Sequence, residues 1–273
     1  MESKSKKIKS LFEALLIPLI YVAALYVIQG LLESVVYIAS LIINPNHAGI
    51  ISYNANMLIL ILSFFGAFGL ASLFVKKRFA VKLFVAKKFD IRLFLSSIIL
   101  GLACYYFTAY LAFILFPSGK PPENAVLEEL TFMTALAAIV AAPVCEEIVM
   151  RRFMIEACYS RKLSPLVFIV LSSLIFALMH DPGSGAYMTV TFFVGVVLAF
   201  CYHNSGIVLY VITAHSAFNA LSFVMTYIDG SSYEAPIAEF VMETSDYFYF
   251  FASAVLIALV MFAFVKLGRR ELK

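Results

Sequence analysis

Long apolar stretches alternate with short polar gaps along the whole chain. They cover residues 11–43, 54–75, 93–116, 131–158, 164–180, 186–202, 206–227 and 245–266. Each approaches or exceeds the roughly 20 residues with which an α-helix crosses a bilayer, and a helix satisfies its own backbone hydrogen bonds in lipid. A membrane β-strand is shorter and alternates apolar with polar residues, which these stretches do not. The pattern predicts an all-α, polytopic integral membrane protein with about eight transmembrane helices.

Composition supports a membrane protein rather than a soluble one. The chain is 63% hydrophobic and 14% charged, with a mean hydropathy of +0.96, whereas about a quarter of the residues of a soluble protein are charged. The polar gaps are too short for a separate soluble domain, so we expect a single transmembrane domain over residues 1–273. The first apolar run contains Glu13 and Pro18 and has no obvious small-residue cleavage site, which predicts a retained helix rather than a signal peptide.

Basic residues lie in short clusters between the apolar runs. This distribution argues against binding to nucleic acid and fits a protein whose partners include membrane lipids. If the N-terminus is cytoplasmic, every Lys and Arg except Lys120 falls on the cytoplasmic side, so both termini are predicted to be cytoplasmic. The four cysteines lack the paired spacing of a metal or disulfide framework and are expected to be buried core residues.

Three polar clusters interrupt the apolar runs in the second half of the chain. They read Glu146-Glu147-x-x-x-Arg151, Phe176-x-x-x-His180 and His215-x-x-x-Asn219. Ionisable groups are costly inside a bilayer and therefore mark functional sites. Any one cluster is also explained by an internal ion pair, a polar helix end or hydrogen bonds between helices. Potential catalytic groups on three spans together favour one buried catalytic site.

Helical spacing predicts different roles for the two neighbouring glutamates. Glu147 and Arg151 stand four residues apart and share a helix face, so they can form an ion pair. Glu146 is rotated by about 100° from Glu147 and is left free to act as a base. Pro143, just upstream, is expected to open the local backbone. At about 1.5 Å per residue, Glu146 and His180 both lie about 22–26 Å from the connection between their spans, so they are expected to meet.

His215 and Asn219 also stand four residues apart and can direct hydrogen-bond donors at a developing oxyanion. The ordered trio of clusters resembles the CAAX proteases and bacteriocin-processing enzymes, the Abi family, which includes the Ras-converting CAAX endopeptidases. The resemblance covers roughly residues 130–225 and is carried by the three motifs.

This resemblance implies an intramembrane glutamic endopeptidase that hydrolyses a peptide bond without a covalent enzyme intermediate, a cofactor or a metal. Glu146 with His180 would activate a water, His215 and Asn219 would form the oxyanion site, and Arg151 would hold Glu147. The substrate would be a membrane-associated protein or peptide, with a CAAX-type and possibly lipidated tail, or a secreted, bacteriocin-like peptide.

Three alternatives stay open at the level of the sequence. Glu146, His180 and His215 could bind a catalytic metal, although the chain has no His-Glu-x-x-His motif. A cysteine protease is disfavoured because Cys145 points about 100° away from Glu146 on a helix. A non-catalytic bacteriocin-immunity or scaffolding protein, or a small transporter, would use the same buried groups without hydrolysis. The sequence leaves the oligomeric state open.

Overall fold

A computed structural model describes residues 4–43, 52–79, 81, 88–116, 131–160, 164–180, 184–228 and 244–268. Within these ranges the secondary structure is entirely helical, which confirms the predicted fold class. In chain order the helices are α1 (Lys4–Ile43), α2 (Tyr53–Phe79), α3 (Ile91–Leu115), α4 (Phe132–Ala135), η2 (Leu136–Ala141), α5 (Ala142–Glu147), η3 (Ile148–Ile155), α6 (Glu156–Ser160), α7 (Pro165–His180), α8 (Gly185–Ser205), α9 (Val208–Ile228) and α10 (Thr244–Leu267).

The segments from α4 to α6 follow one another without a break and form one long helix, here called the central helix. It is one of seven helices in the described part of the chain that are long and apolar enough to cross a membrane. The remaining predicted span, 164–180, forms α7, which has 16 residues. At 1.5 Å per residue α7 is about 24 Å long, shorter than a hydrocarbon core of about 30 Å. The described ranges therefore contain seven full-length spans and one short helix, where the sequence predicted eight spans.

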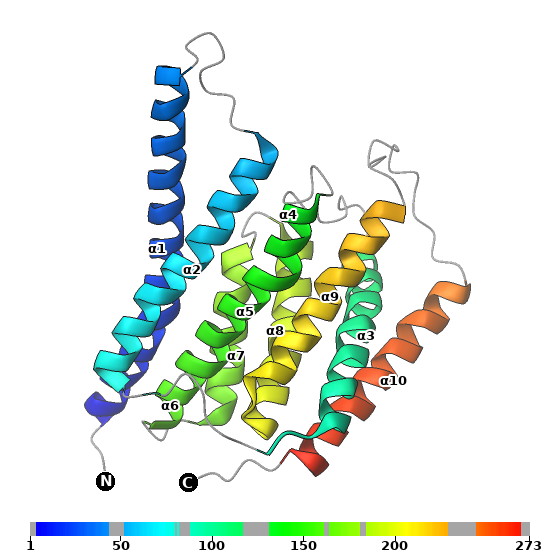
Figure 1. Cartoon of the computed structure of the whole chain (residues 1–273). Coiled ribbons are helices and arrows are strands. Elements are labelled where there is room, and N and C mark those ends of the chain that lie inside the picture. Colours follow the sequence, from blue (N-terminus) through cyan, green and yellow to red (C-terminus); the bar gives the residue numbers. More distant parts are fainter. Residues whose placement is uncertain are drawn as a thin grey trace.

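Successive helices run in alternating directions, so that α1 begins and α10 ends at the same end of the bundle (Figure 1). The central helix packs against α1, α2, α7 and α9, while α3 packs against α9 and α10, and α7 against α8. Half of the most apolar window of the central helix is buried, compared with 22% for α9 and for α10. The helix that carries the two glutamates is thus among the most enclosed.

Small residues bring the helices that surround the site close together. A Cβ atom added to Gly101 of α3 would collide with the Ala214 carbonyl oxygen of α9 and would lie 2.8 Å from the Ala217 Cβ. A Cβ atom added to Gly195 of α8 would lie 3.0 Å from the Ser173 Cβ of α7. Such residues permit close packing of membrane helices. The backbone of α9 next to His215 is therefore held directly against α3.

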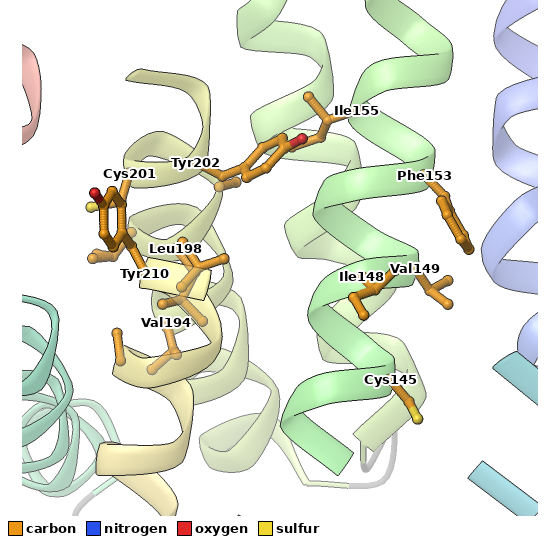
Figure 2. Packing of buried hydrophobic residues seen from close by; sticks show 14 of the residues in the cluster. Cys145, Ile148, Val149, Phe153, Ile155, Val194, Leu198, Cys201, Tyr202 and Tyr210 are labelled. Carbon is orange, nitrogen blue, oxygen red and sulfur yellow. The ribbon is translucent and has the colours of Figure 1, made fainter. Parts of the chain in front are cut away.

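Apolar side chains fill the spaces on both sides of the central helix. Figure 2 shows Cys145 and Phe153 pointing from this helix toward α1 and α2, and the Phe153 ring stacks on Phe68 of α2 at 5.9 Å. On the opposite side, Val194 of α8 and Tyr210 of α9 belong to the same buried cluster. The buried free cysteines are Cys104, Cys145, Cys158 and Cys201. Their predicted role as core residues is confirmed.

Candidate active site

Two π-helical stretches, η2 and η3, flank the glutamates of the central helix. At the end of η2 the Ala142 N–H donates to the Ala137 carbonyl, five residues earlier. The next donor in this register would be residue 143, a proline, which has no N–H. The Asn219 side chain of α9 donates to the Ala138 carbonyl instead, at 2.7 Å. Pro143 therefore opens the backbone as predicted, and Asn219 supplies the missing donor.

Glu147 lies between two positively polarised groups. Its Oε2 is 3.2 Å from Arg151 Nε, with both side chains fully buried. This is the ion pair that the four-residue spacing predicts. Its Oε1 lies 3.0 Å from His215 Nδ1, a contact that the sequence analysis did not anticipate. The other end of the Arg151 guanidinium donates to the Gly195 carbonyl at 3.3 Å. The carboxylate thus links the central helix to α9, and its charge is compensated, as burial requires.

Glu146 faces away from this pair and toward His180. Its Oε2 lies 3.9 Å from His180 Nε2. His180 Nδ1 is 2.7 Å from the Phe176 carbonyl oxygen, which can only accept, so the proton of the neutral ring is on Nδ1. Nε2 and Oε2 are then both acceptors, too far apart for a direct hydrogen bond. One water between them can donate to both, which is the arrangement that prepares a water for deprotonation.

The Phe176 ring packs against three of the functional side chains. Its centroid is 4.4 Å from that of the His180 ring and 5.7 Å from that of the His215 ring. The Arg151 guanidinium carbon lies 5.3 Å from the same centroid. No role was predicted for Phe176 from the sequence, although its four-residue spacing from His180 indicates that the two side chains share a helix face. The ring fixes the two imidazoles relative to each other.

His215 and Asn219 both face the central helix from α9, but they contact different parts of it. The His215 side chain contacts Glu147, and the Asn219 side chain contacts Ala138. Because Nδ1 of His215 is engaged, Nε2 is the ring nitrogen that can act on a substrate. The joint oxyanion role predicted for this pair stays a prediction.

The metal alternative requires three ligands in one group. Among the described residues, no group of three or more His, Cys, Asp or Glu side chains is placed to hold a metal ion. Glu146 contacts His180, whereas Glu147 contacts His215. The two histidines of the predicted metal set, His180 and His215, therefore contact different glutamates.

The fold and the site define a polytopic membrane protein with an enclosed cluster of paired glutamates and histidines suited to acid–base chemistry. Residues 128–221 match the family described as "Rce1-like: Type II CAAX prenyl endopeptidase Rce1-like". This match includes all the site residues named above and confirms the resemblance predicted from the three motifs. At the level of the family, this implies a membrane-embedded protease. Comparisons with curated proteins and with solved structures gave no match.

Proposed function

We propose that the protein is an intramembrane endopeptidase in which Glu146 and His180 activate a water for attack on a peptide carbonyl. The observation that carries this proposal is the pair of acceptor atoms, Oε2 and Nε2, 3.9 Å apart. The water transfers a proton to Glu146 while its oxygen bonds to the carbonyl carbon. The protonated Glu146 then delivers that proton to the leaving amine as the C–N bond breaks. No covalent bond to the enzyme forms.

The negative charge that develops on the carbonyl oxygen requires donors, and α9 offers two. We assign this role to His215 Nε2–H and to the second N–H of the Asn219 amide, because the first N–H bonds to Ala138. Because Nδ1 faces the Glu147 carboxylate, which only accepts, Nδ1 carries a proton, and donation from Nε2 then requires a proton on both nitrogens. The Glu147 carboxylate, 3.0 Å from Nδ1, stabilises positive charge on the ring, as a carboxylate does in other hydrolases. Arg151 keeps Glu147 in place.

The substrate we propose is the C-terminal tail of a membrane-attached protein, of the CAAX type that the family description names. The helices that carry the site are apolar, so the enzyme and the lipid group of a lipidated substrate would both lie in the bilayer. We also propose that the N-terminus is cytoplasmic, because the basic clusters then face the cytoplasm.

The test uses purified protein in detergent and a quenched fluorescent peptide that ends in a prenylated Cys-aliphatic-aliphatic-Met tail. Glu146→Gln preserves the shape of the side chain but cannot accept the proton, so turnover is expected to fall by roughly 10²–10⁴-fold. Glu156→Gln is the matched control. It changes a glutamate of the same helix that accepts from Tyr202, away from Glu146, and turnover is expected to persist.

Substrates other than this tail are sought by comparing peptides from cells that express wild-type protein or Glu146→Gln, using mass spectrometry. If the Glu146→Gln variant turns over the peptide as fast as the wild type, the mechanism is wrong. Absence of turnover on the tail together with identical peptide profiles would instead favour the non-catalytic immunity or scaffolding role.

A further inference from the structure

One buried tyrosine reaches toward the site from outside the residues 128–221 that match the family. Ala14, Ile17 and Tyr21 of α1 are all fully buried. Their spacing of three and four residues places them on one face of the helix. Tyr21 thereby brings a hydroxyl into the interior, where it has no hydrogen-bond partner among the described residues. A buried hydroxyl without a partner is costly, so its presence calls for a reason.

Packing places Tyr21 at the level of the first glutamate. Leu15 of α1 packs against the cluster that contains Met150 and Met154, and α1 runs antiparallel to the central helix (Figure 1). At 1.5 Å per residue, Tyr21 lies about 9 Å further along α1 than Leu15. The same distance along the central helix leads from Met150 and Met154 back to residues 144–148. This window is centred on Glu146.

Electrostatics indicates the same neighbours. The ionisable side chains close enough to Tyr21 to influence its hydroxyl include Glu146 and Cys145, and Cys145 points toward α1 and α2 (Figure 2). The Glu146 Oε2 atom, like the Tyr21 hydroxyl, is buried and has no hydrogen-bond partner within the described ranges. A donor and an acceptor are therefore both buried on this side of the central helix, and neither has a direct hydrogen bond in the part of the chain that the structure describes. A polar pair in this situation is typically bridged by a water.

We propose that the Tyr21 hydroxyl donates a hydrogen bond to the water that Glu146 and His180 activate. The inference rests on the function proposed above. A water that donates its two protons to Glu146 and His180 still has two lone pairs. The Tyr21 O–H occupies one of them and fixes the direction of the other, which attacks the carbonyl carbon. Tyr21 is thus a water-positioning residue supplied by the first span.

The test compares Tyr21→Phe with Tyr210→Phe, using the prenylated fluorescent peptide. Tyr21→Phe is expected to lower kcat by roughly 10- to 100-fold, because the water loses its orientation, with KM nearly unchanged. Its Tm should stay the same or rise, since the removed hydroxyl has no partner in the described protein. Tyr210→Phe removes a buried hydroxyl that accepts from the Asp90 N–H at 2.7 Å. That variant should have a lower Tm and an unchanged kcat.

The outcomes separate this inference from the proposed function. If Glu146→Gln is inactive while Tyr21→Phe retains the wild-type kcat, the role of Tyr21 is wrong and the endopeptidase mechanism stands. If Glu146→Gln is active, both fall together. A Tm loss in Tyr21→Phe as large as that in Tyr210→Phe would show that the hydroxyl supports the fold rather than the water, and this too would overturn the inference.

Discussion

The buried ion pair between Glu147 and Arg151 permits a quantitative prediction. Both side chains are fully buried, and Arg151 cannot lose its proton. In Glu147→Gln the guanidinium loses its ion-pair partner and, among the described residues, keeps the neutral Gly195 carbonyl and the face of Phe176. Removing one partner of a buried pair costs about 3–5 kcal/mol. At about 2–4 °C per kcal/mol for a protein of roughly this size, Tm should fall by about 6–20 °C.

The same contacts predict an asymmetry between the two partners. In Arg151→Met the Glu147 carboxylate still accepts from His215 Nδ1 at 3.0 Å and so keeps one of its two polar partners. Arg151→Met should therefore destabilise the protein less than Glu147→Gln does. In the double variant neither buried charge remains, so its Tm should lie above that of Glu147→Gln.

The buried free cysteines provide the assay. A thiol-reactive dye that fluoresces on modification reports unfolding of the detergent-solubilised protein as these thiols become accessible, and it gives Tm for the wild type and the three variants. Two results would refute the reasoning. One is a Tm for Glu147→Gln within 2 °C or so of the wild type. The other is a double variant whose loss equals the sum of the single losses, because independent sites add and a charge pair does not.

Further predictions concern a hydrogen bond, a helix cap and metal dependence. Asn219→Leu should lower Tm because the Ala138 carbonyl loses its donor, and adding Pro143→Ala, which restores an N–H, should recover Tm but not activity. Arg92 lowers the pKa of Asp90 from 3.8 to about 2. Because this pKa is depressed by folding, the Tm advantage of wild type over Asp90→Asn should be full above pH 3.8 and decline toward pH 2. Turnover should survive EDTA, and its loss with recovery on adding zinc would favour the metal mechanism.

Local rules explain what the sequence predicted correctly. Span positions follow from the length of apolar runs, and the Glu147–Arg151 pair follows from helical periodicity, because both depend on neighbours along one chain segment. The meeting of Glu146 and His180 followed from their similar distance to the connection between their spans. In the structure these side chains are 3.9 Å apart. The predicted span 164–180 agrees with α7 to within one residue, and what the count of eight spans did not consider is that a helix of 16 residues is short for a bilayer.

Contacts between distant segments could not be predicted in this way. The pairing of Glu147 with His215 depends on where α9 packs, which is set in part by the absence of a side chain at Gly101, on a third helix. Tyr21 lies in a span with no recognisable motif, and a tyrosine in an apolar helix reads as a core or interfacial residue. Neither the Glu147–His215 contact nor the position of Tyr21 can be recognised until the packing of the helices is known.

Helical periodicity gives the two neighbouring glutamates different partners and therefore different roles in the site. A rotation of about 100° per residue sends Glu147 toward Arg151 and His215, where its charge is balanced, and Glu146 toward the neutral His180 ring. The Glu147 oxygens contact Arg151 Nε at 3.2 Å and His215 Nδ1 at 3.0 Å, whereas Glu146 Oε2 lies 3.9 Å from His180 Nε2, with room for a water between them. Glu147→Gln should therefore lower both Tm and turnover, and Glu146→Gln mainly turnover, although the substitutions are chemically identical and adjacent.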